Sequence, residues 1–134
     1  MRTALWPEES ENEIAAEIEG FLGDATQGVP FLSAVFIGED MTGAAAGFIE
    51  LFVRNYAEGC GGAVPHVEGW YVEPGFRGRG WGRALMRAAE EWARENGFSE
   101  LASDTTIGNE SSQRAHRKLG FEEVERSVHF RKSL

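Results

Sequence analysis

The sequence lacks the material for an internal disulfide, for a membrane span and for a signal peptide. Cys60 is the one cysteine, so no disulfide can form within the chain, as is typical of a cytoplasmic protein. No apolar run is long enough to cross a bilayer, and the N-terminal stretch MRTALWPEESENE has no apolar core of the kind that directs secretion. We therefore expect a cytoplasmic protein without a membrane partner.

An excess of basic residues is also missing. Lysine and arginine number 13 against 22 acidic residues, which gives a formal net charge of −9. Nucleic-acid phosphates need a basic surface, so we expect no nucleic-acid partner. The negative field would concentrate small cations near the protein, or it serves solubility alone.

What is present suits one domain. The chain has 134 residues, of which 42% are hydrophobic, and no repeat, low-complexity tract or linker interrupts it. We expect residues 1–134 to form a single domain.

Hydrophobic periodicity predicts alternating helices and strands. Ser10 and Glu13 form a capping box that begins the first helix, and the turn-rich GEDMTG joins two strands as a hairpin. The expected elements are the helix Glu11–Leu22, the strands Pro30–Ile37, Ala44–Val53 and Val67–Val72, the helix Trp81–Asn96, a short strand ending at Asp104, a short helix that Asn109 or Ser111 caps and Gly120 ends, and one or two strands in FEEVERSVHFRK. Strands joined through helices pair in parallel while a hairpin is antiparallel, so the predicted fold class is α/β, a mixed sheet covered by helices.

The sequence RGRGWG, Arg77–Gly82, stands between a predicted strand and a predicted helix. A helix N-terminus carries unpaired N–H groups and partial positive charge, and glycines let a phosphate approach them closely. The spacing matches neither the P-loop nor the dinucleotide fingerprint. From spacing alone, a phosphate site and a bare turn are both open. Four arginines surround the loop: Arg77, Arg79, Arg83 and Arg87.

The segment VEPGFRGRGWGRALM resembles the acetyl-CoA signature of the GCN5-related N-acetyltransferases (GNAT), and GFEEVE matches the closing Gly-Phe element of that family. The resemblance extends from Phe31 to the C-terminus. It implies a mostly antiparallel sheet with a splayed parallel strand pair and helices on both faces, acetyl-CoA as co-substrate, and no metal. The implied cofactor-binding residues are Trp70, Tyr71, Val72, Arg77, Gly78, Arg79, Gly80, Trp81, Gly82 and Asn109.

A narrower resemblance rests on five scattered motifs: LWPEE, VRNYAEG, VEGWYV, ELASDT and GFEEVER. Together they are similar to the aminoglycoside 6'-N-acetyltransferases, which confer antibiotic resistance. This similarity implies a homodimer, with the C-terminal VERSVHFRK as a candidate contact, and a drug site formed by Trp6, Tyr56, Glu68, Asp104 and Glu125.

The chemistry of acetyl transfer agrees with these acidic residues. Carboxylates bind the ammonium groups of an aminoglycoside, and one of them must remove a proton before the amine can attack a thioester. We expect Asp104 as the base, with Glu68 second, and a backbone N–H of the strand 70–72 as the oxyanion donor. The structural alternatives are a turn cap for Asp104, exposed strand positions for Glu68 and Glu125, and a core position for Trp6.

Three features depart from the family pattern. His116 stands where most members have a tyrosine that protonates the leaving thiolate, so it either donates that proton or packs on its helix. Glu8 and Glu9 follow Leu-Trp-Pro where the subfamily has a histidine. Only MRTA precedes Leu-Trp-Pro, so about 15 residues, including the first strand, are missing relative to the pattern, which suggests truncation or a misassigned start.

Two other functions remain open at this point. The chain could acetylate a different amine, such as a polyamine, an amino acid, a protein N-terminus or a lysine. It could also bind acetyl-CoA without turnover. Fold and cofactor site alone do not separate these functions.

Overall fold

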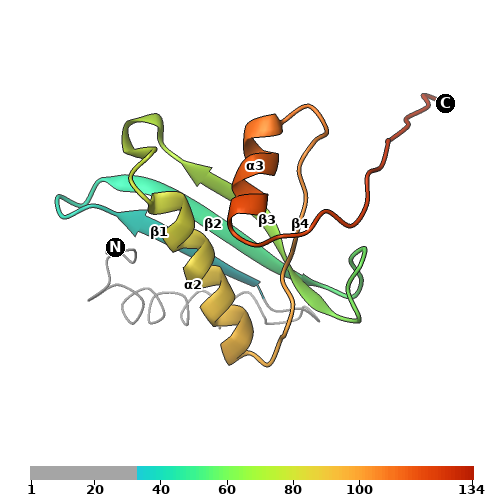
Figure 1. Ribbon diagram of the computed structural model, residues 1–134, viewed down its shortest axis with the longest axis horizontal. Coiled ribbons are helices and arrows are strands. Elements are labelled where there is room, and N and C mark those ends of the chain that lie inside the picture. Colours follow the sequence, from blue (N-terminus) through green and yellow to red (C-terminus); the bar gives the residue numbers. More distant parts are fainter. Residues whose placement is uncertain (1–32) are drawn as a thin grey trace. The chain divides into compact units, whose positions relative to one another are not determined.

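The structure is a computed structural model that describes residues 33–134 (Figure 1). These residues fall into two units, which divide between Ser103 and Asp104. Trp6 and the predicted helix Glu11–Leu22 lie outside the described residues, as do the first three residues of the strand predicted from Pro30. The single domain expected over residues 1–134 stays a prediction.

The first unit contains a four-stranded mixed sheet. Its strands are β1 (Ser33–Glu39), β2 (Ala45–Arg54), β3 (Val64–Val72) and β4 (Ala102–Ser103), in the order β1-β2-β3-β4. The first three pair antiparallel, whereas β3 and β4 are parallel. The predicted hairpin and the predicted mixed sheet are confirmed.

The hairpin turn is organised by Asp40. Its carboxylate accepts hydrogen bonds from the Thr42 hydroxyl at 2.6 Å and from the backbone N–H groups of Thr42 and Ala44. The bond from the Thr42 hydroxyl and that from Ala44 hold the pKa of Asp40 below its usual value. Such side-chain bonds to the backbone are the reason that aspartate favours tight turns.

Two features of β3 matter for the site. The strand begins at Val64, three residues before the predicted start, because Pro65 is tolerated this close to a strand end. Its register with β2 shifts at Glu68, which forms a bulge opposite Glu50 and Leu51. On its other side β3 pairs with β4 only at His66 and Val67, so β4 does not continue beside residues 68–72.

One helix, α2 (Trp81–Glu95), crosses over between the parallel strands and packs on β1, β2 and β3 (Figure 1). The predicted helix is confirmed, with Asn96 as its C-cap. Its apolar residues recur every three or four positions and meet the buried face of the sheet. Fully buried side chains at this contact include Leu85, Met86, Ile49 and Leu51.

The second unit, residues 104–134, contains α3 (Glu110–Lys118). The Asn109 side chain caps this helix by accepting a hydrogen bond from the Ser112 N–H at 3.1 Å, as one of the two predicted caps. Within residues 33–134, no helix is long and apolar enough to cross a membrane.

The strands predicted in residues 121–132 are wrong. Residues 121–134 contain no helix or strand. A strand needs a backbone partner, and the apolar side chains that suggested one are exposed instead: Val124 by 59%, Val128 by 72% and Phe130 by 92%.

The close approach of the paired strands β2 and β3 should depend on Gly47. A Cβ atom at this position would lie 2.2 Å from the Tyr71 carbonyl oxygen and 3.0 Å from the Val72 Cα. We expect Gly47→Ala to lower the free energy of unfolding by about 1–3 kcal/mol, because backbone atoms must move to admit the methyl group. Urea unfolding measures the change.

Gly62→Ala is the matched control, since nothing lies within 4 Å of its Cβ position. Equal denaturation midpoints for the two variants would contradict the close approach of the strands.

Candidate functional site

The loop between β3 and α2 leaves a helix start without a side-chain cap. The loop passes through a short 3-10 helix, η1 (Pro74–Phe76), and reaches Gly80, whose φ of 91° lies in the left-handed region. Gly80 has no side chain to cap α2, and no acidic residue lies in the first turn. The first α-helical hydrogen bond runs from the Ala84 N–H to the Gly80 carbonyl at 3.0 Å. N–H groups ahead of this bond point out of the helix start, which therefore suits an anion.

Aromatic rings and arginines hold this loop. The Phe76 and Trp81 rings meet edge to face at 5.6 Å, and the Arg79 guanidinium carbon lies 5.9 Å from the centre of the Phe76 ring. Arg77 Nε donates to the Val72 carbonyl at 2.7 Å, and its guanidinium lies over the Tyr71 ring. Arg77 thus ties the loop to the end of β3, while Arg79 is exposed beside the helix start.

At the end of β3, every second residue directs its backbone N–H and C=O groups away from β2. The Glu73 N–H donates to Ala46 in β2 at 2.8 Å, so the alternation of an antiparallel ladder also directs the Tyr71 backbone toward β2. The backbones of Trp70 and Val72 consequently face the other edge, where β4 does not continue. The Trp70 indole N–H donates to the Gly82 carbonyl at 3.1 Å and connects this edge to α2. Of the three predicted strand residues, Trp70 and Val72 direct backbone groups to that edge, where the Val72 carbonyl accepts from Arg77.

An open hollow of about 510 Å³ lies on the sheet of the first unit. It is lined by an apolar floor and by charged groups: Ser33, Val35, Glu50, Leu51, Phe52, Arg54 and Glu68. Two carboxylates and one guanidinium give these lining side chains a net negative charge, which suits a cationic amine.

Glu68 is held by two neighbours in this hollow. Arg54 donates from Nε to Oε2 at 2.9 Å and from Nη2 to Oε1 at 3.0 Å. His66, only 3% exposed, places Nδ1 2.9 Å from Oε2, although not in hydrogen-bond alignment. Glu68 is therefore a bulge residue in an ion-pair network and not simply an exposed strand position.

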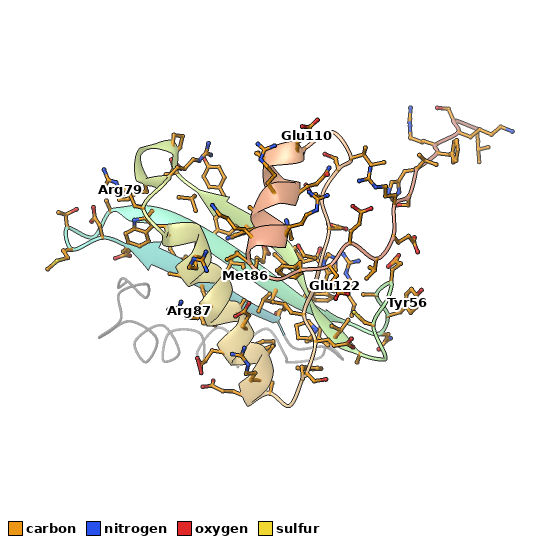
Figure 2. The ribbon with its side chains drawn as sticks, viewed as in Figure 1. Tyr56, Arg79, Met86, Arg87, Glu110 and Glu122 are labelled. Carbon is orange, nitrogen blue, oxygen red and sulfur yellow. The ribbon has the colours of Figure 1, made fainter. Side chains whose placement is uncertain are left out.

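Tyr56 lies far from the glycine loop. It is 68% exposed in the loop between β2 and β3, at the opposite end of β3 from Arg79 (Figure 2). The first unit thus brings Glu68 together with Arg54 and His66, and the loop with Trp70 and Val72, but it does not bring Tyr56 to the loop.

The other predicted residues belong to the second unit. Asp104 is exposed and follows β4 directly, and Glu125 is exposed in residues 121–134. The Asn109 oxygen is used as the helix cap.

His116 is partly buried against the Phe121 ring, and its Nδ1 lies 2.7 Å from the Ser112 carbonyl oxygen. A carbonyl oxygen only accepts hydrogen bonds, so Nδ1 carries a proton, and Nε2 is the ring nitrogen that remains for proton transfer. Nε2 could give up a proton only from the cationic ring.

Cys60 is poorly suited to a covalent acetyl intermediate. Partial burial raises the pKa of its thiol, and the charges of Glu100 and Glu58 raise it further. Less thiolate is then present at neutral pH, and the thiolate is the nucleophile. Since Cys60 is the one cysteine, no other thiol of the chain can carry the acetyl group.

The sequence reasoning missed Arg54 and His66 as neighbours of Glu68. Phe52 pairs with His66 across the two strands, so a known register would have placed Arg54 and His66 on one face. The bulge that adds Glu68 to this face has no clear sequence signal. In the part of the chain that the structure describes, no group of three His, Cys, Asp or Glu residues could hold a metal ion.

Comparisons with known proteins agree with this geometry. The model of the acetyltransferase (GNAT) family matches residues 1–121. The chain is 46% identical to an aminoglycoside N(6')-acetyltransferase type 1 of Klebsiella aerogenes and 41% identical to one of Serratia marcescens, and covers 87% and 89% of them. In both comparisons the whole chain is matched.

The fold is similar to that of AAC(6')-Iy solved in complex with the bisubstrate analogue CoA-S-monomethyl-acetylneamine. The TM-score is 0.73 at 36% identity, over 97% of this chain and 85% of that one. AAC(6')-IG from Acinetobacter haemolyticus gives a TM-score of 0.71 at 31% identity, over 97% and 86% of the two chains. The glycine loop at the start of α2 agrees with these matches, and so does the end of the β3–β4 pairing at Val67. The chain belongs to the GNAT family of acetyltransferases.

Proposed function

We propose that this protein transfers the acetyl group of acetyl-CoA to the 6'-amino group of aminoglycoside antibiotics and so confers resistance to them. The observation that carries the proposal is similarity along the whole chain to enzymes whose names state this activity. The complex of AAC(6')-Iy supports it, because its ligand joins CoA to an acetylated neamine in one molecule.

Acetyl-CoA is the co-substrate, and the loop at the start of α2 fits it. The diphosphate would be bound by the N–H groups at the helix start, with the nearby Arg79 adding positive charge. The pantetheine amides would pair with the edge of β3 at Trp70 and Val72. In this arrangement Gly80 is needed for its left-handed φ, and Arg77 for tying the loop to β3. Acetyl-CoA is an intracellular metabolite, which agrees with the cytoplasmic location expected from the sequence.

The proposed reaction is direct transfer. The 6'-nitrogen attacks the thioester carbonyl carbon, the C–S bond breaks, and the thiolate of CoA takes up a proton. We assign Asp104 as the base that removes the proton of the amine and Glu68 as a ligand of an ammonium group. His116 would protonate the thiolate from Nε2. A backbone N–H at the edge of β3 would stabilise the oxyanion.

The remaining contacts follow the family resemblance. Trp6, Tyr56 and Glu125 are assigned to the drug, and Asn109 to the cofactor. For Asn109 the side-chain amide N–H₂ is the group to offer, since Oδ1 accepts from Ser112.

We also propose a homodimer in which residues 121–134 contact the second copy. Val128 is 72% exposed and Phe130 is 92% exposed in this segment. Exposed apolar side chains in an extended segment suit pairing with another chain.

The substrate assay tests the proposed function first. Thiol release from acetyl-CoA should be fast with kanamycin, which has a 6'-amino group, and absent with an aminoglycoside that has a 6'-hydroxyl. Faster release with a polyamine or a lysine peptide would assign the enzyme to a different amine. If no amine causes thiol release, the protein binds acetyl-CoA without turnover, and the proposal is wrong.

Asp104→Asn should lower kcat by about 10²–10⁴-fold, the usual contribution of a general base. Glu68→Gln should act on the KM for the drug, because it removes binding common to the ground and transition states. Steady-state kinetics at saturating acetyl-CoA measure both effects.

Glu95→Gln, a carboxylate at the exposed end of α2, serves as the control. A kcat for Asp104→Asn within about twofold of the parent would show that Asp104 is not the base and serves only as a turn cap.

Phe130→Glu should convert a dimer into a monomer, since a charge on the apolar contact would be buried without a partner. Light scattering after size exclusion measures the mass. Met41→Glu, at a hairpin position that is 94% exposed, is the matched control and should leave the mass unchanged. A parent protein that is already monomeric would rule out the dimer.

A further inference from the structure

The charged network in the hollow contains Arg54, to which the proposed reaction assigns no role. Arg54, at the end of β2, is not needed for acetyl-CoA, and a positive charge does not itself attract a cationic drug. Nevertheless, its guanidinium grips the carboxylate of Glu68 with two hydrogen bonds, of 2.9 and 3.0 Å. A fork of this kind restrains the orientation of a carboxylate as well as its position.

The network uses the two oxygens of Glu68 unequally. Oε2 lies 2.9 Å from Arg54 Nε, 2.8 Å from Arg54 Nη2 and 2.9 Å from His66 Nδ1. Oε1 has Arg54 Nη2 at 3.0 Å. Each oxygen accepts one hydrogen bond from Arg54, and a carboxylate oxygen can accept about two. Arg54 Nη2 and His66 Nδ1 also lie against Oε2, so Oε1 is the less crowded of the two acceptors.

We propose that Arg54 is a positioning residue that orients Glu68 so that Oε1 accepts one ammonium group of the aminoglycoside. This inference rests on the proposed function, since it concerns the drug site of that reaction. Both Arg54 and Glu68 line the hollow, and Glu50 adds a second carboxylate to its wall. His66 is buried, and its Nδ1 lies 2.9 Å from Oε2 outside hydrogen-bond alignment.

Charge and orientation make opposite predictions for the removal of Arg54. Arg54 neutralises Glu68, so a purely electrostatic account predicts that a neutral residue in its place would strengthen the binding of a cation. Pairs as exposed as this one, with side chains 41% and 33% accessible, are screened by solvent, which limits that gain. The orientation of a charge-assisted hydrogen bond is lost completely without the fork. We therefore expect weaker drug binding without Arg54.

The experiment compares Arg54→Gln, Arg54→Lys and Glu68→Gln. Arg54→Gln should raise the KM for kanamycin about tenfold or more, as expected for one lost charge-assisted hydrogen bond, and leave the KM for acetyl-CoA unchanged. Arg54→Lys keeps the charge but cannot form the fork, so it should show most of the same increase. The double variant Arg54→Gln with Glu68→Gln should be no worse than Glu68→Gln alone, because Arg54 acts through Glu68.

Arg94→Gln is the matched control, since Arg94 is an exposed arginine paired with Glu90 on α2 at 4.0 Å. An unchanged or lower KM for kanamycin in Arg54→Gln would overturn the inference, and so would additive effects of the two substitutions. If the parent protein releases no thiol with kanamycin, the proposed function fails by itself. Calorimetric titration with kanamycin then still tests whether Arg54→Gln weakens binding, and equal affinities would reject the role of Arg54.

Discussion

The backbone N–H groups at the start of α2 must find hydrogen-bond acceptors other than a capping side chain of the helix. Gly80 enters the helix with a φ of 91° and brings no capping group. The neighbouring structure preserves this opening: Phe76 packs on Trp81, Arg77 ties the loop to β3, and the Trp70 indole is bonded to Gly82. A helix start maintained in this way favours a diphosphate, because N–H groups and partial positive charge converge there. The proposed binding place of the CoA diphosphate depends on this arrangement.

The strand β3 connects the proposed sites of the two substrates. In its last residues, beside which β4 does not continue, the backbones of Trp70 and Val72 face the edge that we propose for the cofactor. The bulge at Glu68 moves the acidic side chain into the hollow, where Arg54 grips it. A thioester and an amine must meet within a few ångströms for transfer, about 3–3.5 Å between the reacting atoms. One strand that carries both functions accounts for how they can be brought to the same place.

Local signals in the sequence were enough for the glycine loop and for α2, and they narrowed the cap of α3 to Asn109 or Ser111, since each depends on neighbouring residues in the chain. Features that depend on register were not predictable. A shift of one residue moves a side chain to the other face, so the bulge at Glu68 and its contact with Arg54 became visible only with the strand pairing known. The C-terminal strands failed for a related reason, because alternation around Val128 and Phe130 indicates a potential strand but does not supply its partner.

Amide chemical shifts during a titration with CoA test the central claim most directly. In ¹⁵N-labelled protein, the account predicts that the amides of Gly82 and Arg83, at the start of α2, shift strongly with CoA. With pantetheine, which lacks the diphosphate, they should shift little. If calorimetry detects CoA binding while these two amides stay unchanged, the diphosphate does not bind at the start of α2, and the account of the site is wrong.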